Sequence, residues 1–186
     1  VVRHGTYVIA ENLNNTVKFA NWMYIKFLFK DDVMYPDCLE KMVFVLEKDK
    51  GIGLVCSKRD IITGKDNRFT QGFIANFGNL QVNIPFRSND LTVLKGKGIL
   101  KSKYFKSKPI NIIGEPIAVL FRTELISKIG YFRKDMFQLV DYEYWLRVFK
   151  KYKIAFMSEK LAAFRLHHNQ ASYKNNKSQL NDKELY

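Results

Sequence analysis

The sequence predicts an α/β fold, in which strands and helices alternate in layers. Short apolar runs bounded by glycine or polar turn residues indicate buried strands at 51–57 and 117–121. Elsewhere, as at 37–49 and 141–149, apolar residues recur at i, i+3, i+4 and i+7, the spacing of a helix with one buried face. This alternation is typical of a sheet flanked by helices.

The composition is that of a globular protein with one domain and a substantial core: 186 residues, 47% apolar and 26% charged. The formal net charge of +13 predicts an anionic partner, either nucleic acid, a phosphorylated small molecule or a membrane surface. Cys38 and Cys56 fit neither a disulfide framework nor a zinc motif, so we expect reduced thiols in a cytosolic protein. No apolar run reaches the ~20 residues of a membrane helix.

The chain is expected to open with an extended, strand-like segment over residues 1–10. Leu13, Val17 and Ala20 follow at helical spacing and predict a short helix that leads to a strand beginning at Tyr24. The asparagines around this helix, among them Asn14, are of the kind that favours turns and caps.

The stretch 24–36 is the one around which the chain is organised. Asp31 and Asp32 follow where its strand stops, and Pro36 fits the first position of the next helix. Open α/β sheets place ligands at the carboxyl ends of their strands. Two adjacent carboxylates suit a hard divalent cation, but they could equally cap the following helix, and both interpretations stay open.

The middle of the chain is the hardest to interpret. Residues 58–92 are expected to form a loop or insertion of basic character, because their apolar residues show no clear period. Residues 91–105 are expected to be helical. A run of lysines here predicts a solvated face, with contact to phosphate or lipid as the less favoured alternative. These lysines are Lys95, Lys97, Lys101, Lys103 and Lys106.

The last third predicts a short helix over 123–129, ended by Gly130, and a strongly amphipathic helix opened by Asp141. Strands are expected at 154–157 and 162–166. Residues 173–186, rich in Lys, Asn, Gln and Ser, are expected to be a loose polar C-terminal tail or an isolated helix.

Two segments of the chain resemble family 2 glycosyltransferases, and together they cover most of residues 8–172. In 12–36 the shared pattern is an Asn-containing helix, then Tyr-Ile, Phe-Leu-x-x-Asp-Asp and Pro. In the later half the pattern consists of Ile113-Gly114-Glu115-Pro116, Phe121-Arg122, Ile129-Gly130-Tyr131-Phe132, Asp141-Tyr142-Glu143-Tyr144-Trp145-Leu146-Arg147, and Phe164-Arg165-Leu166-His167 with Gln170 and Ser172.

The resemblance implies a partial GT-A (Rossmann-like) domain over residues 1–172, with a mixed sheet flanked by helices. The chain has no initiator Met and begins after the family's nucleobase-binding portion, so we expect an N-terminally incomplete domain. Missing sheet neighbours would leave an exposed edge strand, which favours a homo-oligomer.

The implied activity is inverting transfer of a sugar from a nucleotide-sugar donor to a hydroxyl of a glycan or lipid-linked acceptor, in cell-wall or polysaccharide biosynthesis. The processive Q-x-x-R-W signature is absent from the sequence, which favours addition of single sugars. The expected location is the cytoplasm, with peripheral contact at the inner face of the membrane as an alternative.

On the donor side, Asp31 matches the second Asp of the family's D-x-D motif and is implied as the metal ligand, supported by Asp32. Phe29 stands where that motif has its first Asp, a departure from the family. Arg165 is implied as a positive neighbour of the donor, and Asn14 matches an asparagine near the donor site. A divalent ion, Mn²⁺ or Mg²⁺, would neutralise the leaving diphosphate.

On the acceptor side, Asp141 is implied as the general base, which takes the proton of the attacking hydroxyl from within ~3 Å. A helix cap is the alternative for Asp141, and it is compatible with the base role. His167 is implied as a further metal or diphosphate contact, with a structural histidine as the alternative. Arg147 is expected to be an ion-pair partner within its own helix.

Two other functions stay open. A basic nucleic-acid-binding module would explain the charge of +13 and the many aromatic residues, and it predicts strongly salt-dependent binding of oligonucleotides. An inactive, truncated glycosyltransferase fragment is the third possibility. The resemblance favours the enzyme and therefore no nucleic-acid partner.

Overall fold

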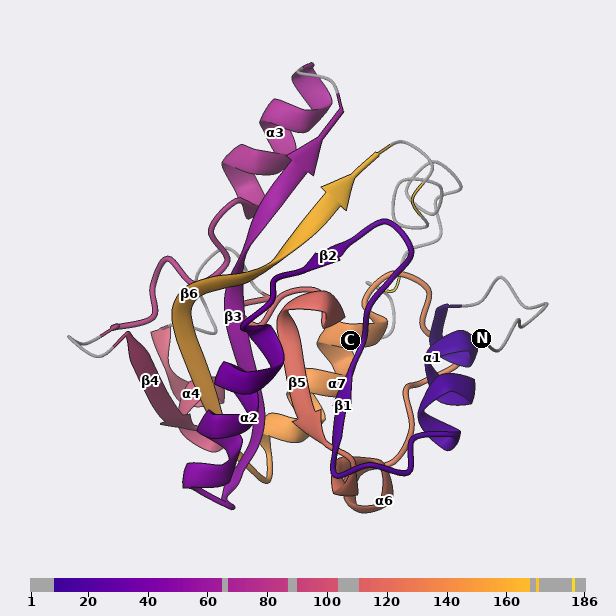
Figure 1. Ribbon diagram of the computed structural model, residues 1–186, viewed down its shortest axis with the longest axis vertical. Helices are drawn as coiled ribbons and strands as arrows, with labels where there is room; N and C mark the ends of the chain where they lie inside the picture. The colour runs from indigo at the N-terminus through magenta and orange to yellow at the C-terminus, as the bar shows by residue number, and fades with distance from the viewer. Residues whose placement is uncertain are drawn as a thin grey trace.

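The computed structural model describes residues 9–64, 67–86, 90–103, 111–167, 170 and 182. These residues form the expected α/β fold, with a mixed sheet between layers of helices (Figure 1). The strands, in their order across the sheet, are β1 (Tyr24–Lys26), β5 (Val119–Arg122), β3 (Ile52–Thr63), β6 (Lys153–Leu166) and β2 (Val33–Met34), while β4 (Leu91–Lys95) also pairs with β6.

The central pair, β3 and β6, is parallel, and the other strand pairs are antiparallel. β4 lies along the first half of β6 and β2 along its second half. Register shifts around Lys58 interrupt the β3–β6 ladder, and such irregularities bend strands. The upper halves of β3 and β6 therefore extend beyond the rest of the sheet (Figure 1).

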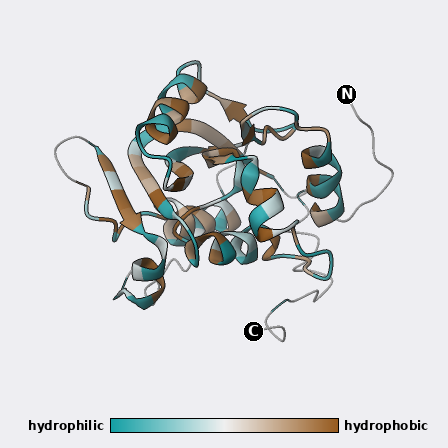
Figure 2. Ribbon diagram, turned by 90° about the horizontal axis from the view of Figure 1, so that it is seen from below, coloured by the Kyte–Doolittle hydropathy of each residue, from teal (hydrophilic) through white to brown (hydrophobic). Residues whose placement is uncertain are grey.

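Both faces of the sheet are covered, because successive strand residues point to opposite sides. Leu54, Phe121 and Phe156 pack on one side with residues of α1, α6 and α7, while Val55 and Leu120 pack on the other side with α2. Figure 2 shows apolar residues concentrated on the strands. The helices are α1 (Ile9–Lys18), α2 (Cys38–Lys48), α3 (Arg68–Phe77), α4 (Gly96–Lys101), the 3-10 helix η1 (Pro116–Ala118), α6 (Glu124–Ile129) and α7 (Val140–Phe149).

Near the amino end, the short helix is confirmed as α1, but the extended segment is wrong where it can be compared. Ile9 and Ala10 belong to α1, and Ala10 is fully buried with Leu13 and Val17. The apolar positions 9, 13 and 17 fall at intervals of four and make one helical face. Residues 1–8 lie outside the described residues.

The middle of the chain is more regular than expected. β3 continues to Thr63, and α3 follows with a capping box in which Asn67 accepts the backbone N–H groups of Phe69 and Thr70. Residues 91–95 are strand, not helix, because they pair with the first half of β6; the helix begins only at Gly96. Residues 65–66, 87–89 and 104–110, and with them Lys106, lie outside the described residues.

Towards the carboxyl end, the two expected strands form one fourteen-residue strand, β6. Most of the expected tail at 173–186 lies outside the described residues, but Asp182 is fully buried and does not belong to a loose tail. Its carboxylate accepts backbone N–H groups of Phe137, Gln138 and Leu139 at 2.6–2.8 Å, directly ahead of α7. Asp182 therefore fixes the backbone segment that leads into α7, where Asp141 lies.

Candidate functional site

A cavity of about 820 Å³, called here the main cavity, opens where the end of β6 and the turn between β1 and β2 meet α1, α3 and the start of α7. Its volume is within the range of small-molecule sites. Five of the six residues singled out from the sequence line it: Asp31, Asp32, Asp141, Arg165 and His167. Two segments far apart in the chain therefore contribute carboxylates to one space.

The two adjacent carboxylates lie in the turn between β1 and β2, which is docked onto the end of β6. The backbone N–H of Arg165 donates to Asp32 Oδ1 at 3.0 Å, and Arg165 Nε donates to the backbone carbonyl of Asp31 at 2.8 Å. These bonds leave the Asp31 carboxylate exposed and Asp32 half-buried. Burial raises the pKa of Asp32, helped by the charges of Glu115 and Asp31 and opposed by the Arg165 hydrogen bond.

The alternative role of Asp31 and Asp32 as helix caps is wrong. The next helix, α2, begins at Cys38 with Asp37 at its N-cap, and the strand β2 stands between the Asp pair and that helix. The expected start at Pro36 is therefore early, by two residues. The carboxylates are held at the cavity by β6 rather than by a helix end.

Asp31 and His167 are in contact: His167 Nε2 lies 3.1 Å from Asp31 Oδ2. Both groups are of kinds that bind Mn²⁺, a carboxylate oxygen and an imidazole nitrogen. Across the described part of the chain there is no cluster of three or more His, Cys, Asp or Glu that could hold a metal. The pair can therefore supply part of a coordination sphere, which phosphate and water oxygens would have to complete.

Asp141 lies in the first turn of α7, one residue after the helix begins, and it is half-buried. Burial raises the pKa of Asp141 to about 7, and the nearby charge of Glu115 acts in the same direction. The Tyr142 N–H, which donates to Asp141 Oδ1 at 2.7 Å, partly offsets this shift. A carboxyl with such a pKa can exchange a proton near neutral pH.

An ion pair in the cavity wall, between Arg59 and Glu115, was not anticipated. Arg59 is almost fully buried, and its Nη2 donates to Glu115 Oε1 at 2.8 Å and to the Phe77 carbonyl at 3.1 Å. Glu115 belongs to the Ile-Gly-Glu-Pro motif, so the sequence marked its position but not its role. Its charge favours the protonated forms of both Asp32 and Asp141.

Asn14, the sixth residue singled out, does not reach the main cavity. It is buried, its Nδ2 donates to the Phe132 carbonyl at 2.8 Å, and its Oδ1 accepts the Phe132 N–H at 2.9 Å. This is a structural use of the amide. Arg147 is confirmed as an ion-pair partner within its helix, because it binds Glu143 at 2.8 and 2.9 Å.

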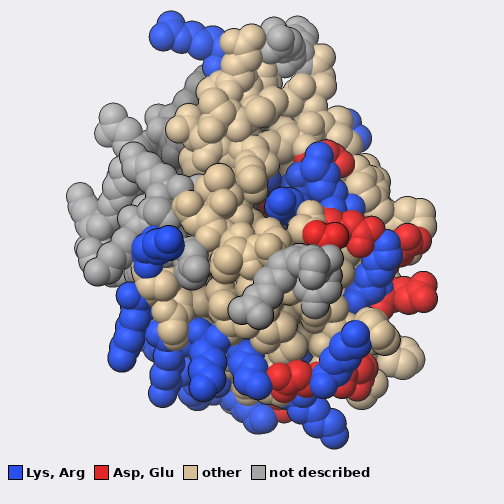
Figure 3. Space-filling model, turned by 90° about the vertical axis from the view of Figure 1, so that its left-hand side faces the viewer, with Lys and Arg blue, Asp and Glu red and all other residues tan. Residues whose placement is uncertain are grey.

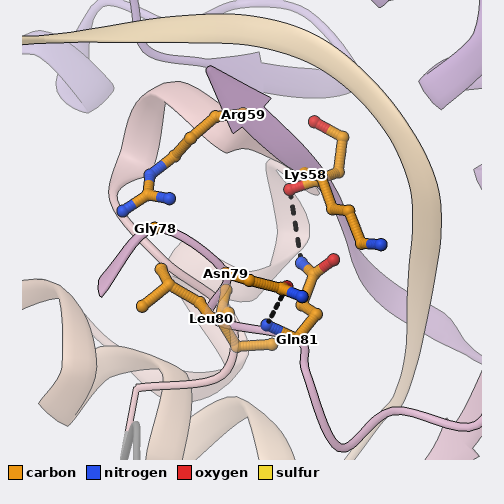
Figure 4. A pocket seen from close by; sticks show the side chains of 8 residues that line it. Lys58, Arg59, Gly78, Asn79, Leu80 and Gln81 are labelled. Atoms are coloured by element: carbon orange, nitrogen blue, oxygen red, sulfur yellow. Dashed lines mark hydrogen bonds between the residues drawn. The ribbon is translucent and has the colours of Figure 1, made fainter. Parts of the chain in front are cut away.

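A second hollow lies under the loop after α3, between the side chains of Arg59, Lys58 and Gln81 (Figure 4). Gln81 Nε2 donates to the backbone carbonyl of Ser57 at 3.2 Å, and the Gln81 N–H donates to Asn79 Oδ1 at 3.2 Å. The volume of this second hollow, about 10 Å³, is that of a single water molecule, so the hollow cannot hold a sugar or a nucleotide.

The positive charge of the chain is not concentrated in the main cavity. Of the described lining residues, Arg165 is the one Lys or Arg, against four carboxylates. Figure 3 shows Lys and Arg gathered instead over the lower part of another face. Lys95, Lys97, Lys101 and Lys103, in and after β4 and α4, are exposed, as expected of a solvated run.

Comparison with known proteins gives a distant relative without an assigned activity. No family model matches the chain. It is similar to an uncharacterised protein of Mycobacterium tuberculosis (strain CDC 1551 / Oshkosh), with 29% identity over 155 residues, which are 83% of this chain and 46% of that protein. The chain thus spans about half the length of this relative. Among the described residues, no helix is long and apolar enough to cross a bilayer.

Proposed function

We propose that this chain carries the metal-binding and acceptor-activating part of an inverting, family 2-like glycosyltransferase with a GT-A fold. One observation carries the proposal: Asp31 and Asp141 come from distant parts of the chain and line the same cavity. A sugar-transfer site needs a ligand for the cation and a general base that border the same cavity. We assign the first role to Asp31 and the second to Asp141.

The donor side of the proposal is the turn between β1 and β2. Asp31 and His167 would hold Mn²⁺ or Mg²⁺ together with oxygens of the donor's diphosphate, and the contact of the two side chains at 3.1 Å supports this assignment. The ion, when bound, would neutralise the charge that develops on the leaving diphosphate. Asp32 orients this turn through its bond to the Arg165 backbone, and the Arg165 guanidinium lies beside it.

The acceptor side is the first turn of α7. With a pKa of about 7, Asp141 is roughly half ionised at neutral pH, so it can take the proton of an acceptor hydroxyl and release it to water. Burial raises this pKa and the charge of Glu115 adds to the shift, while Asp182 holds the backbone ahead of the helix. Each of these residues acts on the position or the protonation of Asp141.

The charge distribution supports a transferase over a nucleic-acid-binding module. A groove for single-stranded nucleic acid combines stacking aromatic rings with a lining of Lys and Arg. The described lining of the main cavity holds Asp31, Asp32, Glu115 and Asp141 with one arginine.

We propose that the transfer takes place in the cytoplasm or at the inner face of the membrane. The acceptor there would be a glycan or a lipid-linked molecule.

A sugar-transfer assay tests the proposal. The chain is incubated with Mn²⁺, radiolabelled UDP- or GDP-sugars and a panel of alkyl glycosides, and labelled product is counted. We expect Asp141→Asn to reduce transfer at least ~100-fold, the usual contribution of a general base, and to leave the affinity for UDP or GDP unchanged. Asp135→Asn, in an exposed ion pair with Arg133, is the matched control. Transfer that survives Asp141→Asn would contradict the base assignment.

A further inference from the structure

Helix α3 lines one end of the main cavity with an apolar face. Phe69, Phe73 and Phe77 recur at intervals of four, share one side of the helix and line the main cavity. Thr70 is the one buried residue of this helix, and the Phe77 side chain is 43% exposed. The helix projects beyond the sheet at the top of Figure 1. Its phenylalanines therefore belong to the cavity wall rather than to the core: Phe69 and Phe73 are half-buried, and Phe77 is exposed.

This aromatic face is connected to the proposed reaction centre. The Phe73 ring stacks on Phe164 of β6, with centroids 6.0 Å apart and an angle of 19° between the rings. The Arg59 guanidinium lies 6.0 Å from the centroid of the same Phe164 ring and donates a hydrogen bond to Glu115. Phe164, Glu115 and Asp141 line the same cavity as the α3 phenylalanines, so the aromatic face and the proposed base border one space.

The α3 end of the cavity has few hydrogen-bonding groups for the hydroxyls of a sugar. A buried hydroxyl needs a hydrogen-bond partner, and without one its burial costs affinity. Asn76 is the polar residue that α3 adds to the lining, and its Nδ2 already donates to the Gly72 carbonyl at 2.7 Å. A hydrocarbon chain needs no such partners and gains from contact with the phenylalanines.

We propose that α3 and Phe164 form a subsite for the hydrocarbon part of the acceptor, so that the reacting hydroxyl belongs to a lipid-linked or alkyl-bearing molecule. The inference rests on the proposed function and narrows its acceptor class. The hydrocarbon lies along Phe69, Phe73 and Phe164, and the hydroxyl end lies towards Asp141.

Two soluble probes with the same sugar, octyl β-D-glucoside and methyl β-D-glucoside, test the subsite. Each is titrated below the critical micelle concentration of the octyl compound, and binding is followed by saturation-transfer NMR. Each buried methylene gives a factor of about four in affinity, so burial of a few predicts at least tenfold tighter binding of the octyl compound. Phe73→Ala is expected to remove most of this preference. Ile74→Ala is the matched control, because Ile74 lies on the same helix, 46% exposed, and does not line the cavity.

A second variant fills the subsite rather than removing its wall. A Cβ at Gly72 would meet no atom within 4 Å, and Gly72 lines the cavity, so Gly72→Leu places a side chain in the space of the hydrocarbon. We expect at least tenfold weaker binding of octyl glucoside, with a melting temperature no lower than that of the wild type, because Leu forms helices better than Gly.

The outcomes separate this inference from the function on which it rests. Equal affinity for the two glucosides, or a loss in Ile74→Ala as large as in Phe73→Ala, would overturn the subsite. If Mn²⁺-dependent UDP or GDP binding in the same samples persists, the transferase proposal survives that result. An octyl preference without nucleotide binding would keep the subsite and remove the transferase. Phe73-dependent binding to phosphatidylcholine vesicles, without binding of monomeric octyl glucoside, would assign the face to a membrane and overturn the inference.

Discussion

His167 and Asp31, 136 positions apart in the chain, lie with their side chains 3.1 Å from each other. The contact joins the end of β6 to the turn between β1 and β2, and Arg165 reinforces the junction from the same strand end. The two side chains thereby present an oxygen and a nitrogen to one point at the rim of the main cavity.

His167→Ala is expected to weaken Mn²⁺-dependent UDP or GDP binding by about tenfold, or about 1.4 kcal/mol. Imidazole favours Mn²⁺ over Mg²⁺, so the loss is expected to be smaller when Mg²⁺ is used. Calorimetric titrations with each metal provide the comparison, and the Mg²⁺ series serves as the internal control. Equal losses with both metals would indicate that His167 does not coordinate the ion.

Asp141→Asn is expected to stabilise the protein in a pH-dependent way. The pKa of Asp141 is about 7 in the folded state, above its ordinary value of 3.8, so the folded state holds a proton that the unfolded state has lost between these pH values. The stability of the wild type therefore falls as pH rises through this range, and the full penalty applies above pH 7.

In urea titrations, the variant should match the wild type near pH 4 and exceed it by about 1–2 kcal/mol at pH 8, a value reduced for partial exposure. Asp135→Asn, at an exposed site, should show no such rise. A difference between Asp141→Asn and the wild type that is constant with pH would contradict the raised pKa.

Arg59→Met is expected to destabilise the fold by about 3 kcal/mol, because it leaves the Glu115 carboxylate unpaired in the cavity wall. Lys41→Met removes a surface lysine that pairs with Asp37 and Glu159, and its effect on stability should be much smaller. Denaturant titrations of the two variants measure the contrast. Similar losses of stability in both variants would show that the Arg59–Glu115 ion pair stabilises the fold no more than a surface ion pair does.

Asn14→Ala distinguishes a structural role from a donor-binding role. The change leaves the backbone N–H and carbonyl of Phe132 without their partner, which should cost about 2 kcal/mol of unfolding free energy. The dissociation constant for UDP or GDP with Mn²⁺ should stay within twofold of the wild type. A tenfold loss of nucleotide affinity, with little loss of stability, would restore Asn14 to the donor site.

The elements with strong local signals could be predicted from the sequence. Helical spacing located α2 and α7 to within two residues and indicated α1, whose start at Ile9 is earlier than expected; the apolar run after Gly51 located the start of β3. The turn that holds Asp31 and Asp32 was also expected, although β1 ends at Lys26, earlier than its aromatic residues indicate. Lys26 pairs with Leu120, and only Val119 precedes it in β5 before the backbone turns into η1, so the sheet offers little further pairing to β1.

The rest depended on contacts between distant segments. Leu91–Lys95 is a strand because β6 pairs with it, and the helical pattern around it gives no hint of that partner. The phenylalanines at 69, 73 and 77 do recur at helical spacing, but the glycines at 72 and 78 obscure the signal. The pKa of Asp141 depends on burial and on the charge of Glu115, neither of which has a local signature.

Calorimetry of UDP and GDP binding, with and without Mn²⁺, on the wild type, Asp31→Ala and Asp37→Ala decides whether the turn after β1 holds a cation for a nucleotide donor. Asp37 is an exposed carboxylate at the start of α2 and controls for the loss of charge. The account predicts binding that requires Mn²⁺, falls at least tenfold in Asp31→Ala and persists in Asp37→Ala. Nucleotide binding that is independent of Mn²⁺, or equal in Asp31→Ala and the wild type, would contradict it.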